Sequence, residues 1–383
     1  MTRIAAVLCC LAVSGGGPIA ASDSCILGPQ PAASLLIPYF EVDLDEPGGR
    51  TTLFAVSNTS AEESAIARVV LWTDWGIPTL AADIILNSED IQTINLRDIF
   101  AGSLANGSIV PIQPETLNSA ALARLKAKHT GIANPGDGLC YASPRSEKTL
   151  ATGYVTVDLL SRSSRSVVFQ TDSGYFQGTE PLASQDNRLA GDFFLVEPDE
   201  AFAQGFEAVH LVAQPERFSQ GGGPTFYGAF VAGSGADGRL PLSTRHKARF
   251  LVDSPAVAGT KVIIWLDNGV IATPQECGDG PPWFNFGIPD LKIRGVDEEA
   301  NEFSAFVAEN PVRTQVFAVG TDIPVPAGAG ELDVQTQVRD AIGAPPNFDP
   351  VQGWIAPVIS ASGLYSVGWN AIRMDDGCIT LAD

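Results

Sequence analysis

The chain has 383 residues, of which 44 are acidic and 23 basic, giving a formal net charge of -21 with 45% hydrophobic residues. This apolar content is enough for sizeable cores, so the acidity is expected on a folded surface and not in a disordered tail. Such a surface repels phosphate backbones and anionic lipid headgroups, which argues against nucleic-acid and membrane-surface functions, although it also serves solubility alone.

The first residues have the pattern of a secretory signal. Arg3 is followed by ten apolar residues, 4–13, a run about half as long as the ~20 residues that a membrane-spanning helix needs. We expect residues 1–21 to be removed and the mature chain to reach the periplasm or the outside of the cell. No later charge-free apolar run predicts membrane insertion.

Four cysteines remain after that leader: Cys25, Cys140, Cys277 and Cys378. An even number in an oxidising compartment favours two disulfides, and the wide spacing without Cys-x-x-Cys argues against a redox motif or a zinc site. Three connectivities are open. If each half of the chain closes its own bridge, the simplest pairing is Cys25–Cys140 with Cys277–Cys378.

Short runs rich in β-branched residues and separated by Gly, Pro, Asn and Asp predict an all-β protein of Ig-like or jelly-roll-type sandwiches. No regular alternation of helix and strand indicates a parallel α/β sheet. Pro38 lies in the first run and has no N–H for a ladder, so we expect a sheet edge or a bulge there. The expected strands are 35–40, 53–56, 67–72, 83–86, 91–96, 153–157, 166–169, 208–212, 262–265, 315–319 and 365–369.

One or two short helices are expected between strands. Residues 117–129 place their leucines on one face, with Thr116 as a candidate N-cap and Gly131 as a candidate C-terminal residue. A second short helix is expected at 199–204.

An echo within the chain favours an internal repeat. Phe54-Ala55-Val56 followed by residues 69–76, with Trp72 at their centre, resembles Phe250-Leu251-Val252 followed by residues 262–269, with Trp265 at their centre. Chance similarity of two strand pairs is the alternative.

If the echo is a repeat, the mature chain contains two sandwich domains. The first would span 22–218, with the helical insertion near 117–129. A glycine-rich linker would follow at 219–224, and the second domain would span 225–383.

Five further runs are informative together: 51–58, 71–76, 95–100, 152–158 and 225–228. They resemble a family of uncharacterised exported bacterial proteins. This resemblance implies export and repetition, and it brings no activity, cofactor or catalytic residue.

Acidic clusters beside turns are the chemically suggestive feature. Asp43, Asp45 and Glu46 could offer oxygen ligands to calcium, the one cofactor considered. The twelfth position of such a loop is Phe54, where an EF-hand needs Glu, so a hairpin turn with exposed acids is the competing interpretation. The same holds for the acids at 297–299 and 375–376.

The three histidines show no metal-ligand spacing. We expect His129 to interact with a helix C-terminus, His210 to be a half-buried strand residue, and His246 to lie on the surface. No nucleophile motif or phosphate-binding loop occurs.

A glycosidase needs only two carboxylates across a cleft, and sequence alone leaves too many acid pairs to choose from. Among the tryptophans, Trp72 and Trp265 are expected in the core, whereas Trp75 and Trp283 are the better candidates for exposed contacts.

The leading hypothesis is therefore a secreted, non-catalytic β-sandwich protein with a surface binding, adhesion or assembly role. Its expected partners are a protein or a polysaccharide at the cell surface. A secreted carbohydrate-active hydrolase with a carboxylate pair and a calcium-stabilised surface scaffold are the alternatives.

Overall fold

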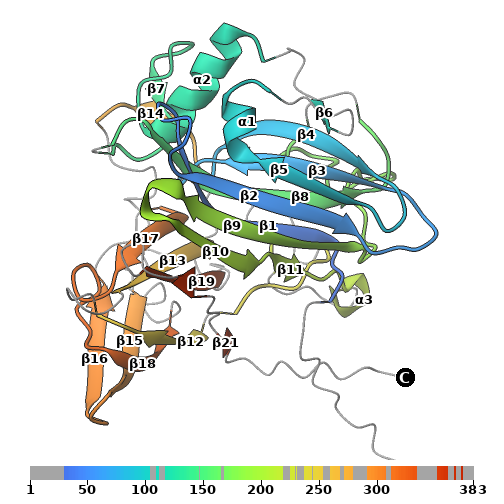
Figure 1. Ribbon diagram of the computed structural model, residues 1–383. Helices are drawn as coiled ribbons and strands as arrows, with labels where there is room; N and C mark the ends of the chain where they lie inside the picture. Colours follow the sequence, from blue (N-terminus) through green and yellow to red (C-terminus); the bar gives the residue numbers. More distant parts are fainter. Residues whose placement is uncertain are drawn as a thin grey trace, which may run out of the picture. The chain divides into compact units, whose positions relative to one another are not determined.

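Strands dominate the molecule: 48% of residues are in strands and 9% in helices, which confirms the all-β class with few short helices. The described residues belong to one compact unit, Pro29–Asp375 (Figure 1). None of their helices has the length and apolarity to cross a membrane. The computed structural model describes residues 30–103, 109–111, 117–145, 147–164, 168–218, 225–228, 230, 237–243, 245–252, 259–267, 271–278, 291–307, 312–333, 352–360, 366–367 and 372–373.

Several sequence predictions fall outside these residues. They are the leader at 1–21, Cys25 and Cys378, the linker at 219–224, Trp283, and the acids at 375–376.

The first half of the chain forms two antiparallel sheets. The six-stranded sheet has the order β11-β1-β8-β3-β4-β6, and the four-stranded sheet has the order β10-β9-β2-β5. The strands are β1 (Ser34–Asp43), β2 (Thr51–Asn58), β3 (Ala65–Trp72), β4 (Pro78–Leu86), β5 (Ile91–Asn95), β6 (Ile109–Pro111), β8 (Leu150–Leu160), β9 (Leu189–Glu197), β10 (Phe202–Glu207) and β11 (Val209–Leu211).

The second half forms two more antiparallel sheets, of orders β16-β15-β18-β12-β21 and β17-β13-β19-β20. A short ladder between β7 (Leu139–Cys140) and β14 (Gln275–Glu276) joins the two halves. The strands of the second half are β12 (Arg245–Phe250), β13 (Gly259–Asp267), β15 (Leu291–Asp297), β16 (Glu302–Val307), β17 (Thr314–Ala318), β18 (Gly328–Asp333), β19 (Gln352–Ser360), β20 (Ser366–Val367) and β21 (Ile372–Arg373).

The strands that contain the similar runs each have hydrogen-bonded neighbours on both sides. In the first half β2 lies between β5 and β9, and β3 lies between β4 and β8; in the second, β12 lies between β18 and β21, and β13 lies between β17 and β19. Trp72 of β3 stands opposite Tyr154 of β8, and Trp265 of β13 stands opposite Trp354 of β19. Each of these tryptophans thus stands opposite an aromatic residue of the neighbouring strand.

The helix expected at 117–129 is confirmed as α2 (Ser119–Thr130). Its N-cap is Asn118, whose side chain accepts the Ala121 N–H, and Gly131 ends it in the left-handed conformation. The helix expected at 199–204 is wrong: a 3-10 turn, η1 (Pro198–Glu200), leads directly into β10. Two further short helices are α1 (Leu96–Phe100) and α3 (Pro215–Phe218).

β1 is buried along nearly its whole length because both faces of the six-stranded sheet are covered. Its register shifts between Ile37 and Phe40, which confirms the bulge expected at Pro38. The freed Pro38 carbonyl accepts the hydroxyl of Thr314, from β17, at 2.6 Å. The bulge thus links the two halves.

Four buried clusters of described residues hold the molecule together. One lies within the first sheet pair and also takes in Ile263 and Val358 of the second half. Another lies between the two sheets of the second half. The third covers the other face of the six-stranded sheet and includes Trp72 and Trp265. The fourth and smallest joins Trp75 and Cys140 of the first half to Ala272 and Val312 of the second. Three of the four clusters thus draw side chains from both halves.

Candidate functional site

The turn at residues 73–76 connects β3 to β4 and contacts the second half. The buried Asp74 carboxylate accepts the Ser143 N–H and pairs with Arg145 at 3.0 Å. Its backbone carbonyl accepts the Arg313 N–H at 2.7 Å. Gly76 has φ +80, and a Cβ there would lie 2.3 Å from Nε of Arg313, so only glycine fits.

Arg313 is the centre of a group that we call the junction cluster: Asp74, Asp267, Arg313 and Gln352. The Arg313 guanidinium is buried and donates to Asp267 Oδ1 at 2.6 Å. It also lies over the Phe230 ring. Burial is the largest single influence on the pKa of Arg313 and lowers it. The Asp267 carboxylate and Tyr154 together outweigh burial, so the pKa is raised. The guanidinium therefore stays charged.

Gln352, the first residue of β19, ties this cluster to the segment at 225–243. Its amide nitrogen lies 3.2 Å from Asp267 Oδ2 and also donates to the carbonyls of Thr225 and Phe226. Its amide oxygen accepts the Leu242 N–H at 2.9 Å. Every hydrogen-bonding atom of the side chain is thus used in the architecture.

A second buried group surrounds Asp158 of β8. Its two oxygens accept hydrogen bonds from the side chains of Ser34, Tyr227, Gln170 and Tyr175, at 2.5 to 2.9 Å. Burial and the neighbouring Asp158 charge raise the pKa of both tyrosines well above its usual value. The phenols therefore remain donors at every physiological pH.

The Asp158 carboxylate belongs to a polar row across the six-stranded sheet. In register, Asp83, Arg68, Asp158 and Ser34 stand on β4, β3, β8 and β1. Arg68 pairs with Asp83 at 2.9 Å, and Arg239 donates to the Ser34 hydroxyl at 3.0 Å. Opposite charges alternate, so each buried ion has a partner.

Aromatic rings connect the two groups. Trp72 stacks on Tyr154, whose edge meets Trp265, and Trp265 stacks on Phe226 at 5.3 Å. Trp72 and Trp265 are buried, as expected. The expectation for Trp75 is wrong: it is 1% exposed, and its indole N–H donates to Ser143 Oγ at 2.9 Å.

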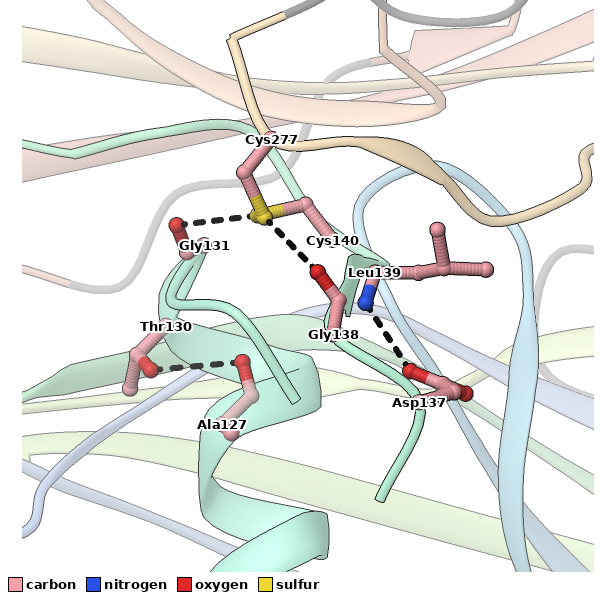
Figure 2. The surroundings of a disulfide bond; sticks show 8 residues. All are labelled: Ala127, Thr130, Gly131, Asp137, Gly138, Leu139, Cys140 and Cys277. Carbon is pink, nitrogen blue, oxygen red and sulfur yellow. Dashed lines mark hydrogen bonds between the residues drawn. A yellow bond between two sulfur atoms is a disulfide. The ribbon is translucent and has the colours of Figure 1, made fainter. Parts of the chain in front are cut away.

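The disulfide pairing expected from the two-halves argument is wrong, because Cys140 is bonded to Cys277 (Figure 2). The bond extends the β7–β14 ladder, in which Cys140 stands opposite Gln275. The carbonyl oxygens of Gly131 and Gly138 approach the two sulfurs. The bridge therefore crosses between the halves and does not close either one.

Glu41 of β1 is the buried acid whose surroundings best suit a general acid. It is 8% exposed, accepts the Tyr39 hydroxyl at 3.0 Å, and lies 3.9 Å from Arg50. Burial raises the pKa of its carboxyl, the Glu197 charge raises it further, and Arg50 lowers it. Glu41 and Glu197 are thus two neighbouring acids in different environments.

The acids expected to bind calcium form the turn between β1 and β2. Asp43 Oδ1 accepts the N–H groups of Asp45 and Glu46, at 3.0 and 3.2 Å. Arg97 donates to the Glu46 and Gly49 carbonyls of the same turn. In the part of the chain that the structure describes, no group of three His, Cys, Asp or Glu is arranged to hold a metal. The calcium site stays a prediction without a supporting ligand set.

Asp297 behaves like Asp43. Its carboxylate accepts a hydrogen bond from the Asn301 side chain and the backbone N–H groups of Glu299 and Asn301. The Asn301 side-chain bond has the largest effect, and together these bonds lower the pKa of Asp297. The acids at 297–299 thus organise a hairpin turn.

The histidines are structural. His129 Nδ1 donates to the Thr152 carbonyl at 2.9 Å, and Nε2 lies 2.7 Å from the Thr79 hydroxyl. His210 is half-buried and accepts the Gly191 N–H, as expected for a strand residue. The surface position expected for His246 is wrong, because it is buried against Trp354 with its rings 5.6 Å apart.

No protein-family model matches the chain, and no curated protein matches it.

Proposed function

We propose that this protein is an exported, non-catalytic β-sandwich protein that acts through its surface in binding, adhesion or assembly. The observation that carries the proposal is the state of the buried aspartates. Asp158 accepts four side-chain hydrogen bonds, Asp267 is held by Arg313 and Gln352, and Asp83 is held by Arg68. A carboxylate saturated by protein donors stabilises architecture and has no capacity left for a substrate.

We further propose that the two halves are copies of one sandwich of Ig-like or jelly-roll type. The corresponding strand orders support this, as does the register that sets Trp72 opposite Tyr154 and Trp265 opposite Trp354. A disulfide between halves fits an oxidising compartment and thus supports export.

A binding screen tests the surface role. The disulfide-intact mature chain is applied to arrays of glycans and of cell-surface proteins, and its mass is followed by light scattering over a concentration series. We expect a saturable partner or a concentration-dependent assembly. A persistent monomer that binds nothing on either array contradicts the proposal.

Glu41 supports a second candidate, a secreted carbohydrate-active hydrolase. Its raised pKa suits a general acid, and the nearby Glu197 carboxylate would serve as its partner. The test is hydrolysis of a polysaccharide panel by the wild type and by Glu41→Gln. Glu147→Gln, which removes an exposed acid that pairs with Arg50, is the matched control.

Hydrolysis by the wild type that falls at least about a hundredfold in Glu41→Gln alone would support this candidate. No hydrolysis by the wild type, or an equal loss in both variants, rejects it.

A further inference from the structure

The four-stranded sheet β10-β9-β2-β5 has one face on the core and one face outward. Along β9, buried residues alternate with exposed or half-buried ones, which are Ala190, Asp192, Phe194 and Val196. β2 alternates in the same way, and its half-buried Leu53 stands in register with Phe194. The four strands lie side by side (Figure 1). The outward face of this sheet therefore presents apolar side chains to solvent.

Phe194 is the aromatic residue of this outward face and is 44% exposed. It stands opposite Gly205 of β10, where a Cβ would lie 2.7 Å from the ring. The ring thus lies over the glycine backbone and keeps its exposed part toward solvent. Its neighbours across the ladder and along the strand include Leu53 and Val196. An aromatic ring among aliphatic side chains is the composition found at the centre of protein–protein interfaces.

Two acids border this apolar centre. Asp192 stands directly opposite Glu207 of β10 and on the same face as Phe194. Burial, which has the larger effect, and the Asp192 charge both raise the pKa of Glu207. Among the described residues, Glu207 Oε1 is buried and has no hydrogen-bond partner. Like charges directly opposite each other destabilise an antiparallel pair, so the fold gains nothing from this arrangement.

The five-stranded sheet of the second half places its charges differently. Lys247, Glu331 and Arg294 stand in register on β12, β18 and β15, so opposite charges alternate along that row. The row of the two acids continues with Ala55 and Thr93 instead. None of the outward residues of β10, β9, β2 and β5, all of which the structure describes, is Lys, Arg or His. The counter-charge that completes the first row is thus missing from the second.

We propose that this surface, which we call the β9 face (Leu53, Asp192, Phe194, Val196 and Glu207), docks a protein segment that combines apolar side chains with a lysine or arginine. The inference rests on the proposed surface-binding function and names its partner class. Apolar side chains of the partner pack on the Phe194 ring and on Leu53. Its cation binds the Asp192 and Glu207 carboxylates and lies close enough to contact the ring as well.

The composition of the β9 face favours this partner over others. Acids without a cation repel phosphate backbones, sulfated glycans and anionic lipids. A neutral glycan needs hydrogen-bonding groups around the ring, but the residues in register with Phe194 are Leu53 and Gly205. Two copies of the chain cannot join through this face alone with matched charges, because both would bring acids and neither a cation.

The experiment selects ligands for the full mature chain, with its disulfide intact, from a random dodecapeptide phage library at physiological salt. Selected peptides are synthesised, and their affinities are measured by fluorescence anisotropy. The charge variant is Asp192→Asn/Glu207→Gln. Its control is Glu180→Gln/Glu298→Gln, which removes the same charge from exposed positions away from the β9 face.

A second pair of variants tests the ring. Phe194→Ala removes it, and Ile85→Ala removes an exposed apolar side chain of β4 as the matched control. We expect the selected peptides to combine Lys or Arg with apolar residues. We expect each test variant to bind them at least about tenfold more weakly than its control. No selected peptide, peptides without a cation, or equal affinities of a test variant and its control would overturn the inference.

Stability distinguishes a docking role of the acids from a structural one. Because Asp192 and Glu207 repel each other, the charge variant should unfold at the same urea concentration as the wild type or at a higher one. A lower midpoint would show that the acids serve the fold and would reject the docking role. An arrayed neutral glycan that Phe194→Ala no longer binds rejects the inference in favour of that glycan. Array hits that none of these variants weakens leave the surface function standing and reject this partner class.

Discussion

His129 is fully buried at the end of α2, so the neutral ring and not the charged one fits the fold. Burial, which is the main influence, lowers its pKa to about 4, compared with about 6.5 in an unfolded chain. The unfolded state therefore binds more protons between these values, and stability must fall as the pH drops from about 6.5 to 4.

We predict that His129 contributes roughly 3 kcal/mol to the loss of unfolding free energy between pH 7 and pH 4. Urea unfolding of the wild type and of His129→Gln at both pH values measures this share, because other titrating groups cancel in the comparison. A variant that loses as much stability as the wild type contradicts the prediction.

Asp158 shows how one carboxylate can organise several segments. We predict that Asp158→Asn lowers the free energy of unfolding by about 3–5 kcal/mol, since the amide NH₂ would face donors from Tyr175 or Tyr227. Tyr175→Phe, which removes a single donor, should cost about 1–2 kcal/mol. Denaturant midpoints measure both losses. Equal losses in the two variants would contradict the prediction that Asp158 supports more than one hydrogen bond.

Among the elements, the segment from α2 to β7 depends on the disulfide. The closed loop spans a sequence separation of 137 residues, for which loop entropy gives stabilisation of up to about 5 kcal/mol. We predict that Cys140→Ser/Cys277→Ser loses a large part of this amount in urea unfolding. Non-reducing peptide mapping must recover Cys140 joined to Cys277, and a peptide joining Cys140 to Cys25 would contradict the structure.

Strands with β-branched runs were predictable because such residues fit a pleated, half-buried surface. β1, β3 and β13 are examples. Other strands break those rules. β18 contains two glycines, and β19 carries Pro357 opposite Val262, although proline is rare inside a sheet. β10 begins Phe-Ala-Gln, which suits a helix locally, but pairing with β9 decides its form.

The residues of the candidate site were harder to predict from the sequence. Asp74 and Asp267 each follow a tryptophan by two residues in the echoed runs, and this shared spacing was the one usable signal. Arg313, Gln352 and Arg239 stand alone in segments without a pattern. Their importance comes from distant partners that only the folded chain brings together.

At the scale of the whole molecule, the junction cluster makes the halves interdependent. Arg313 bonds to the backbone of Asp74 in the first half and to the side chain of Asp267 in the second. Three of the buried clusters also take side chains from both halves. Neither half can therefore unfold without exposing apolar surface and unpaired charge of the other.

We predict a single cooperative thermal transition for the wild type, with the calorimetric and van't Hoff enthalpies equal. Arg313→Met should lower the free energy of unfolding by about 3–5 kcal/mol because it leaves Asp267 buried without its counter-ion, and adding Asp267→Asn should recover part of that loss. Two resolved endotherms in the wild type would contradict this coupling.

The covalent link between Cys140 and Cys277 also governs how the molecule responds to proteolysis. A single cut anywhere between those positions separates the backbone into two pieces, yet the sulfur bridge keeps them tethered. A nicked copy would migrate intact on a non-reducing gel and fall into fragments only after reduction, so damage to the connecting segments need not release either piece.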